Sequence, residues 1–471
     1  MAETTAGRYD VAIVGGGPGG YVAAIRASQL GLKTALVEKD PKPGGTCLHR
    51  GCIPTKALLQ TASVLDSARD AKAFGVKVEG VSLDLPAANK FKDGVVQKNA
   101  AGVEFLLKKN SVQTFRGRGE LLSPNRIQVQ DEGGKTQTIE AAHIVLATGS
   151  VPSRPGFLKF DHPRIITSDE ALKLTEVPRH VTVLGAGAVG CEFASVWASF
   201  GAQVVIVEML DRLLPIEDRD CSEELQRAFK RRNIDYRVAT KLEKAEPHDQ
   251  GVELLLVDAK GQSEKLSTDL LLCAVGRSPY TEGLGLQKVG IAVERGFVSV
   301  DGAQRTRVPS VYAIGDIVGS TPLLAHVASA EGIVAVESIA GKKPPAIDPK
   351  RIPSATYCHP EVASIGLTEA QAVAAGHQVK TSKFPFSALG KGGILRARHG
   401  FFKLVADERY GEILGVHILG DHATDLISEA CALLGLEATD VDLAHIIHPH
   451  PTLGEGMLEA AHGLVGGAIH F

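Results

Sequence analysis

The chain has 471 residues, 44% of them hydrophobic, which is enough for about three domains with buried cores. Lys and Arg number 51 against 54 Asp and Glu, so the net charge of −3 gives no reason to expect nucleic acid or an anionic membrane as a partner. No apolar stretch approaches the roughly 20 residues of a membrane span, and Met1–Arg8 lacks a signal-peptide pattern. We therefore expect a cytoplasmic protein.

The first predicted element is a βαβ unit at the N-terminus. Tyr9–Val14 has the pattern of a buried strand, Gly15–Gly20 is a glycine loop, and Tyr21–Leu30 has the pattern of a helix. A second strand, Thr34–Val37, follows and is closed by Glu38. This order is typical of a dinucleotide-binding fold.

The segment Gly44–Lys56 reads GGTCLHRGCIPTK and contains the one close pair among seven cysteines. Residues five apart in a regular helix have Cα atoms roughly 8–9 Å apart, whereas a disulfide needs less than about 7 Å. We therefore expect a turn distorted at Gly51, a strained and reducible bridge between Cys47 and Cys52, and Pro54 in the first turn of a following helix.

The spacing of this segment also places a lysine near Cys52 and leaves other readings of the cysteine pair open. Lys56 lies four residues after Cys52, on the same helical face, where a cation favours a thiolate. Two unconnected thiols, or a zinc site with His49 as a third ligand, remain alternatives. Zinc would need two more ligands, and none has zinc-like spacing nearby.

A second βαβ unit follows the first after 170 residues. Val181–Leu184, the loop Gly185–Gly190, Cys191–Phe200 and Val204–Val207 repeat the pattern, and Glu208 closes it. Each acid follows the first glycine of its loop by 23 residues, from 15 to 38 and from 185 to 208. Two copies predict two dinucleotide sites in one chain.

In such loops the first glycine allows a tight turn, the second lets a pyrophosphate approach the backbone, and the third lets helix and strand pack closely. We expect Glu38 and Glu208 to accept hydrogen bonds from ribose hydroxyls. A carboxylate at Glu208 repels a 2′-phosphate, and the nearest arginine, Arg212, is expected to be solvated. The second site therefore favours NAD over NADP.

The remaining elements are a hairpin with its tip at Asp131–Lys135 and a polar boundary at Gly341–Pro349. The last third of the chain has no glycine loop and predicts a separate α+β domain. Its expected strands are Ala363–Gly366, Gly400–Val405 and Ile413–Ile418, and its expected helices are Thr424–Leu434 and Met457–Leu464.

Taken with Ala147–Gly149, Ala313–Asp316 and His448–Glu455, the cysteine segment and the two glycine loops resemble the dihydrolipoamide dehydrogenases, the lipoamide branch of the pyridine nucleotide–disulfide oxidoreductases. The resemblance runs from about Asp10 to Gly463. It implies an α/β fold with two Rossmann-like domains, for FAD and NAD, and a C-terminal α+β dimerisation domain. The implied boundaries are 1–151 and 277–345 for FAD, 152–276 for NAD, and 346–471 for the interface.

The resemblance also implies the residues of each cofactor site. Gly119 would meet the adenine through its backbone, Asp316 the ribityl region, and Ala325, in a helix starting within 322–326, the flavin pyrimidine through its N–H. The implied FAD residues are Gly15, Gly17, Gly20, Glu38, Lys39, Gly45, Thr46, Lys56, Gly119, Thr148, Gly149, Ser150, Asp316, Leu323, Leu324 and Ala325. The implied NAD residues are Gly185, Gly187, Val189, Gly190, Glu208, Leu242, Gly276 and Arg277.

For catalysis the resemblance implies Cys47 as interchange thiol and Cys52 as flavin-side thiol. His450 would be the base, and Glu455 would orient its imidazole. This histidine would reach the active site of the other subunit of a homodimer. His450–Pro451 would be a cis peptide. Glu192 would pair with Lys56.

The implied partners are lipoyl domains of separate acyltransferase or glycine-cleavage carrier chains, and the core of a 2-oxo acid dehydrogenase complex. The alternative activity is another NAD(P)H-dependent, glutathione-reductase-like disulfide reductase. A purely structural subunit and a metal site at His445, His448 and His450 are further alternatives. Where many relatives have Asn-Val, this chain has His49 and Arg50, a positive charge that we expect to tune the thiol pKa or redox potential.

Overall fold

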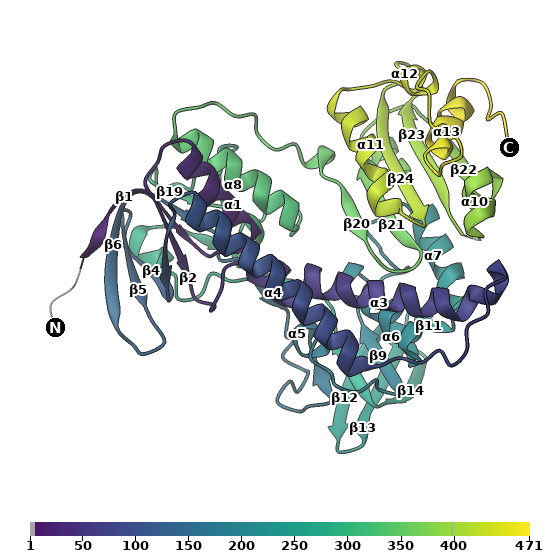
Figure 1. The fold of residues 1–471 in the computed structure, drawn as a ribbon, viewed down its shortest axis with the longest axis horizontal. Coiled ribbons are helices and arrows are strands. Elements are labelled where there is room, and N and C mark those ends of the chain that lie inside the picture. Colours follow the sequence, from purple (N-terminus) through teal and green to yellow (C-terminus); the bar gives the residue numbers. More distant parts are fainter. Residues whose placement is uncertain (1–4, 398) are drawn as a thin grey trace. The chain divides into compact units, whose positions relative to one another are not determined.

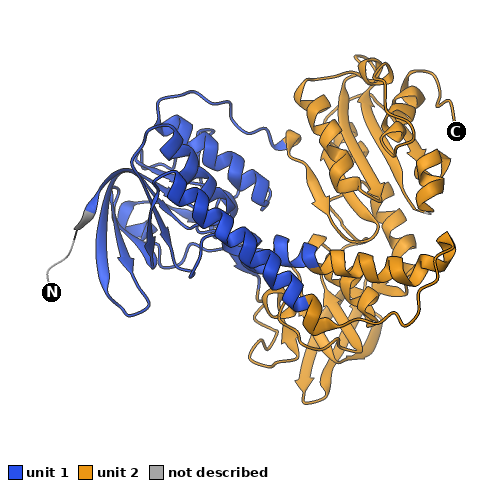
Figure 2. Ribbon diagram, viewed as in Figure 1, with its two compact units in different colours: residues 1–57, 89–153, 277–349 blue, residues 58–88, 154–276, 350–471 orange. Residues whose placement is uncertain are grey.

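The computed structural model describes residues 5–397 and 399–471, and the chain divides into two compact units (Figures 1 and 2). Unit 1 comprises residues 1–57, 89–153 and 277–349, and unit 2 comprises residues 58–88, 154–276 and 350–471. Unit 1 carries the first glycine loop and the cysteine pair, and unit 2 the second glycine loop and the C-terminal region. The finer three-domain division stays a prediction.

Unit 1 is built on a seven-stranded sheet with the order β3-β2-β1-β6-β5-β4, in which β19 also pairs with β6. Its strands are β1 Thr5–Val14, β2 Thr34–Glu38, β3 Gln113–Arg116, β4 Arg118–Ser123, β5 Arg126–Gln130, β6 Thr136–Leu146 and β19 Val311–Ala313. β1 pairs in parallel with both β2 and β6, whereas β4, β5 and β6 form antiparallel pairs. The tip of the β5–β6 hairpin is the predicted Asp131–Lys135 turn.

Helices cover one face of this sheet (Figure 1). Val11 and Ile13 of β1 pack on that face with alanines of the helices, while Ala12 and Val14 point into the cluster on the opposite face. The helices are α1 Pro18–Gln29, α4 Leu85–Lys109 from residue 89 on, and α8 Ala325–Ile339. Short elements complete the unit: α2 Gly45–Arg50, the start of α3 Cys52–Asp70, β7 Ser150–Pro152, β16 Arg277–Pro279, β17 Val293–Glu294 and β18 Phe297–Val298.

Helices α1 and α8 pack closely because glycines lie at their contact. A Cβ at Gly332 would lie 2.7 Å from the carbonyl oxygen of Gly19, and a Cβ at Gly19 would lie 3.0 Å from that of Ala328. Any larger side chain would push the helices apart. This contact fixes the N-terminal ends of both helices within unit 1.

Unit 2 contains a five-stranded parallel sheet with the order β11-β10-β9-β15-β8 and a separate antiparallel sheet, β12-β13-β14. The strands are β8 Ile165–Ile166, β9 His180–Leu184, β10 Gln203–Val207, β11 Ile234–Arg237, β12 Thr240–His248, β13 Gly251–Asp258, β14 Ser263–Thr268 and β15 Leu270–Cys273. Its helices are α5 Ser168–Ala171, α6 Ala188–Phe200 and α7 Arg219–Arg231. Helix α6 contacts β9 and β10, as a Rossmann-like unit requires.

The C-terminal part of unit 2 is an antiparallel sheet with the order β20-β21-β24-β23-β22. The strands are β20 Ser354–Thr356, β21 Glu361–Gly366, β22 Val379–Pro385, β23 Phe401–Asp407 and β24 Ile413–Gly420, and the helices are α9 Glu369–Ala374, α10 Gly390–Leu395, α11 Ala423–Gly435, α12 Asp440–Ala444 and α13 Glu455–Val465. Helices α11 and α13 cover one face (Figure 1). Strands β23 and β24 are buried along their whole length because both of their faces are covered.

The predicted fold class is confirmed, and the differences lie at element ends. Both loop-following helices begin three residues before the predicted Tyr21 and Cys191, because the last part of each glycine loop forms the first helical turn. Helix α8 begins at Ala325, within the range 322–326 predicted for its start. Among the described residues, no helix combines the length and apolarity needed to cross a bilayer.

Candidate active site

The first glycine loop forms a tight turn with an open helix start. Gly15 has φ +108°, and a Cβ there would lie 2.2 Å from the oxygen of Ala147. A Cβ at Gly20 would lie 1.8 Å from the oxygen of Gly15, so only glycine lets α1 pack this closely on β1. Gly17 is the N-cap of α1 and no side chain of the described residues caps it, which leaves backbone N–H groups at this helix end available to an anion.

The second glycine loop repeats this geometry in unit 2. Gly185 has φ +104°, and a Cβ at Gly190 would lie 2.0 Å from the oxygen of Gly185. Gly187 is the uncapped N-cap of α6, and within the described chain no atom lies within 4 Å of a Cβ placed on it. Both loops therefore have room for a phosphate beside a helix N-terminus.

Glu38 and Glu208 hold the two loops in the same way. The N–H of Gly16 donates to Glu38 Oε2 at 2.6 Å, and the N–H of Ala186 donates to Glu208 Oε2 at 2.7 Å. The other oxygen accepts the N–H two residues on, at Asp40 and Leu210, at 2.8 Å in each case. A carboxylate oxygen has two lone pairs, so each acid can still accept a ribose hydroxyl.

Burial separates the two acids. Glu38 is 6% exposed, and this burial raises the pKa of Glu38 although the N–H groups of Asp40 and Gly16 oppose the shift. Glu208 is only half-buried.

Arg212 differs from its prediction as a solvated residue: its side chain is 28% exposed and donates to the carbonyl of Pro215 at 2.9 Å. Two nitrogens of that guanidinium therefore have partners, Pro215 and Asp211, whereas its buried Nε has none among the described residues.

Tyr280 organises part of the predicted FAD site and was missed by the sequence prediction. Thr148 Oγ1 donates to the carbonyl of Tyr280 at 2.6 Å, and the Tyr280 N–H donates to Gly149 at 2.8 Å. The Lys39 ammonium lies 4.1 Å from the centre of the Tyr280 ring. The sequence offered only an aromatic residue after a proline as a signal.

A polar cluster joins three predicted site residues within unit 1. Ser150 Oγ donates to the Asp316 carboxylate, and Arg277 Nε donates to Ser150 Oγ at 2.7 Å. Arg277 Nη2 also donates to the Ser150 carbonyl at 2.8 Å. Arg277 was predicted on the NAD side, but its side chain contacts residues predicted for FAD.

Glu331 was also missed. It is fully buried on α8, where it accepts the N–H of Gly315 at 2.5 Å and the hydroxyl of Thr321 at 2.6 Å. These bonds fix the loop that carries Asp316, while burial raises the pKa of Glu331. A single carboxylate within the apolar run of this helix was the available signal.

Other predicted FAD residues lie at backbone positions of the same unit. Leu323 and Leu324 precede Ala325, the first residue of α8, and no side chain caps that helix start. Gly119 lies on β4, where a Cβ would come 2.9 Å from Val14 Cγ1. Gly119 therefore has no room for a side chain, and the start of α8 offers backbone N–H groups.

The cysteine turn, residues 44–52, breaks where the sequence predicts. Helix α2 ends at Arg50, its C-cap Gly51 has φ −144° and ψ −109°, and α3 begins at Cys52, so Pro54 lies in its first turn. The two cysteines are present as thiols joined by a side-chain hydrogen bond. That bond and burial raise the pKa of Cys47, while the charge of Lys56 opposes the shift.

The turn lies against the first glycine loop. A Cβ at Gly45, whose φ is +60°, would come 2.6 Å from Gly17 Cα, and the Gly44 N–H donates to the Gly16 carbonyl at 2.7 Å. Thr46 follows Gly45 in α2. The cysteines are thus placed beside a candidate dinucleotide site in the same compact unit.

His450 and Glu455 form the predicted pair in unit 2. His450 Nδ1 lies 2.8 Å from Glu455 Oε1, and the Thr452 N–H donates to Oε2 at 2.8 Å. Those two contacts hold the pKa of Glu455 below its usual range although burial opposes them. An Nδ1 proton bound to the carboxylate leaves Nε2 as a base, and the imidazole is 75% exposed. The expected cis peptide at His450–Pro451 is present.

The neighbouring histidines have partners of their own. His448 Nε2 lies 2.8 Å from Glu429 Oε1, and this hydrogen bond raises the pKa of His448. His445 Nδ1 lies 2.7 Å from the Val441 carbonyl oxygen. Each of these imidazoles therefore has a hydrogen-bonding partner outside the His450–Glu455 pair.

The remaining predicted residues of unit 2 are placed as follows. Glu192 is 3% exposed on α6 and accepts the Tyr357 N–H at 3.0 Å. Its predicted pairing with Lys56 joins the two units and stays a prediction. Val189 is exposed at the start of α6, Gly276 ends a segment of unit 2, and Leu242 is buried at 4% in an apolar core, so its side chain offers little open surface.

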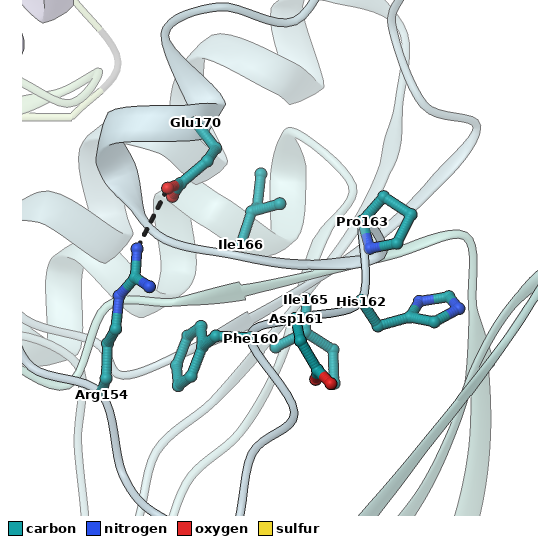
Figure 3. A pocket seen from close by; sticks show the side chains of 8 residues that line it. All are labelled: Arg154, Phe160, Asp161, His162, Pro163, Ile165, Ile166 and Glu170. Atoms are coloured by element: carbon teal, nitrogen blue, oxygen red, sulfur yellow. Dashed lines mark hydrogen bonds and ion pairs between the residues drawn. The ribbon is translucent and has the colours of Figure 1, made fainter.

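Unit 2 also contains a small pocket whose lining residues, all between 154 and 170, include none of the predicted site residues. It is lined by Arg154, Phe160, Asp161, His162, Pro163, Ile165, Ile166 and Glu170 (Figure 3). Arg154 and Glu170 form an ion pair at 3.1 Å within it. Its volume of about 210 Å³ is below the roughly 300 Å³ at which small-molecule sites usually begin.

Comparison with known proteins agrees with this geometry. Residues 9–332 match the model of the pyridine nucleotide-disulphide oxidoreductases, and residues 352–461 match the dimerisation domain of that family. The chain is 44% identical to a dihydrolipoyl dehydrogenase of Bacillus subtilis, covering 98% of this chain and 99% of the relative. It is 40% identical to the mitochondrial dihydrolipoyl dehydrogenase 1 of Arabidopsis thaliana, covering 100% and 93%.

Two solved structures have a fold similar to that of this chain. The crystal structure of LpdA from Mycobacterium tuberculosis superposes with a TM-score of 0.89 at 27% identity, covering 97% of this chain and 99% of that one. The flavoprotein disulfide reductase RclA from Escherichia coli, solved as a Cu(II) complex, gives 0.86 at 25% identity, covering 97% and 99%. The chain therefore belongs to the pyridine nucleotide–disulphide oxidoreductase family.

Proposed function

We propose that this chain is a dihydrolipoyl dehydrogenase, which oxidises protein-bound dihydrolipoamide to lipoamide and reduces NAD⁺ through FAD. The observation that carries the proposal is the contact between Cys47 and Cys52 in a turn packed on the first glycine loop. The names of relatives at 40–44% identity over nearly the whole chain support the substrate.

The residues of unit 1 fit FAD. The uncapped start of α1 at Gly17 suits a diphosphate, Glu38 a ribose, and the Ser150–Asp316–Arg277 cluster the polar middle of the cofactor. The uncapped start of α8 suits the flavin edge that becomes negative on reduction. When bound, FAD accepts an electron pair from the dithiol and gives it as hydride to NAD⁺.

The thiol steps belong to the chain itself. His450 Nε2, supplied by a second copy of the chain, takes the proton from one substrate thiol, and Glu455 holds the imidazole in position. The substrate thiolate attacks Cys47 Sγ and breaks a Cys47–Cys52 disulfide, so that Cys52 leaves as a thiolate. The second substrate sulfur then closes the lipoamide ring and releases Cys47, which takes the second substrate proton and leaves as a thiol while His450 holds the first. The substrate loses two electrons and two protons, and the enzyme disulfide gains the electrons.

NAD⁺ rather than NADP⁺ is the proposed acceptor at the second glycine loop. A 2′-phosphate would meet the Glu208 carboxylate, which repels it. The Arg212 guanidinium donates to Pro215 and contacts Asp211, so it is not directed to a phosphate at Glu208.

The proposed working form is a homodimer, supported by the match to a dimerisation domain. Lipoyl domains on separate acyltransferase or glycine-cleavage carrier chains are the proposed substrates, and the core of a 2-oxo acid dehydrogenase complex is the proposed docking partner. A cytoplasmic location completes the proposal.

Steady-state turnover tests the proposal against a glutathione-reductase-like activity. The purified enzyme would be assayed with dihydrolipoamide and either NAD⁺ or NADP⁺, and with oxidised glutathione and either NADH or NADPH. Fast reduction of NAD⁺ by dihydrolipoamide supports the proposal. Turnover of glutathione without turnover of dihydrolipoamide would contradict the substrate assignment while leaving the family unchanged.

A further inference from the structure

His49 and Arg50 lie inside the cysteine turn, yet both side chains bind the loop that follows β2. Arg50 Nη2 donates to Asp40 Oδ2 at 2.8 Å, with side chains 34% and 20% exposed. His49 Nε2 lies 3.2 Å from the carbonyl oxygen of Lys42 and 3.1 Å from that of Pro43. Carbonyl oxygens only accept, so Nε2 carries the proton and donates.

Asp40 has a second role through its backbone. Its N–H donates to Glu38 Oε1 at 2.8 Å, while the opposite oxygen of Glu38 accepts the N–H of Gly16. A continuous set of hydrogen bonds therefore runs from the first glycine loop through Glu38 and Asp40 to Arg50. Arg50 is the last residue of α2, two positions before Cys52.

We propose that the Asp40–Arg50 pair, together with His49, couples the ribose carboxylate Glu38 to the cysteine turn, so that Arg50 and His49 are positioning residues for the cysteine pair. The pair would hold the turn while the distance between the sulfurs changes in each redox cycle. The inference rests on the proposed function for the roles of Glu38 and the cysteines.

The contacts argue against direct charge tuning of the thiols by Arg50. Its guanidinium is neutralised by a carboxylate at 2.8 Å, and the field of a neutral ion pair falls off faster than that of a single charge. The cation that acts on Cys47 is Lys56, whose charge favours the thiolate. Arg50 thus acts through Asp40 and the backbone of the turn.

The test uses two single variants of the full-length holoenzyme, Asp40→Asn and Arg50→Gln, and their double variant. Each single change removes the same ion pair, so we expect both to raise the dissociation constant of FAD about two- to five-fold. The double variant should raise the dissociation constant of FAD no more than the single variant with the larger effect does, because only one shared interaction is removed. Fluorescence of released flavin measures this loss.

A second measurement separates positioning from charge tuning. The long-wavelength absorbance of two-electron-reduced enzyme reports the thiolate beside the flavin, and its pH midpoint follows the thiol pKa. Positioning leaves that midpoint unchanged in both singles. Tuning predicts opposite shifts: Arg50→Gln raises the midpoint, whereas Asp40→Asn leaves Arg50 unpaired and lowers it. Opposite shifts, or additive losses of FAD, would overturn the proposal.

Two further variants serve as controls. Lys42→Gln removes the exposed ion pair with Glu104, at 3.1 Å, from the same loop and should retain FAD as the parent does. Arg50→Lys keeps a cation for Asp40 and should recover part of the loss. If the parent enzyme fails to oxidise dihydrolipoamide, the proposed function falls, but the FAD measurements on the five variants still decide the role of the pair.

Discussion

The two glycine loops are nearly identical in local geometry but differ in what surrounds them. In both, a glycine near φ +105° turns the chain, a third glycine admits the helix, and a carboxylate binds two backbone N–H groups. In unit 1 the cysteine turn packs on Gly17 and α8 packs on α1. In unit 2, among the described residues, a Cβ placed on Gly187 would meet no atom within 4 Å outside its own helix and chain neighbours, and Met209 and Leu210 beyond Glu208 are 68% and 49% exposed.

This difference indicates two kinds of ligand. An enclosed loop with a buried Glu38 suits a cofactor that stays bound, whereas an open loop with a half-buried Glu208 suits one that enters and leaves at every turnover. The same βαβ unit therefore serves for retention in one unit and for exchange in the other. Five variants, with one control, can break or sharpen this comparison.

The largest expected effect comes from the chemistry beside the enclosed loop. Cys52→Ser removes the flavin-side thiol, so no disulfide forms, and we expect oxidation of dihydrolipoamide to fall roughly 10⁴-fold or more. Reduction of the bound flavin by NADH should persist because the open loop is untouched. Stopped-flow absorbance at the flavin band measures both rates, and a variant that oxidises dihydrolipoamide near normally would rule out the dithiol mechanism.

Removal of the base touches neither loop. His450→Gln should lower dihydrolipoamide turnover by about 10²- to 10⁴-fold, the usual contribution of a general base. Flavin content and the NADH half-reaction should be unchanged. His448→Gln is the matched control, because His448 binds Glu429 and should retain most activity. Equal losses in the two variants would argue for a structural effect instead.

The packing glycines test the two loops directly. Gly190→Ala places a Cβ 2.0 Å from Gly185 O, so the backbone must shift to relieve the overpacking. We expect this shift to raise the KM for NAD⁺ about 10- to 100-fold. The flavin content should be normal. Gly20→Ala should instead release flavin during purification. Flavin absorbance per chain and steady-state kinetics distinguish these results. Loss of flavin from Gly190→Ala would contradict separate roles for the loops.

The smallest expected effect is at the acid of the open loop. Glu208→Gln keeps the shape of the side chain but removes its charge. We therefore expect the KM for NAD⁺ to rise about 10-fold, as for loss of a charged hydrogen bond. NADP⁺ use should improve, because repulsion of the 2′-phosphate is removed. The ratio of kcat/KM for the two cofactors measures the change, and an unaltered ratio would mean that Glu208 does not select between them.

Local signals in the sequence predicted most of the fold and the geometry of the two glycine loops, whereas the roles of the site residues stay predictions. Strand–glycine–helix order placed both loops, and Gly51 between the cysteines predicted the break between α2 and α3. Contacts between distant segments were not predictable in this way. Glu331 reaches Gly315 because α8 packs on the turn at 315–317, and Arg277 reaches Ser150 because β16 pairs with β7.

The direction of charged side chains was the other gap. The positive charge of His49 and Arg50 suggested tuning of the thiols, but spacing along the chain does not reveal that Arg50 turns back to Asp40. Arg212 was expected in solvent for the same reason, and its contact with Pro215 depends on how the chain folds after β10.

Anaerobic titration of the purified enzyme with dihydrolipoamide, followed by NAD⁺ or NADP⁺, tests the central claim most directly. We expect a yellow flavoprotein that gains a long-wavelength band as the thiolate forms, and then transfers its electrons to NAD⁺ in preference to NADP⁺. A flavin that NADH reduces but dihydrolipoamide does not would contradict the claim and indicate another disulfide substrate.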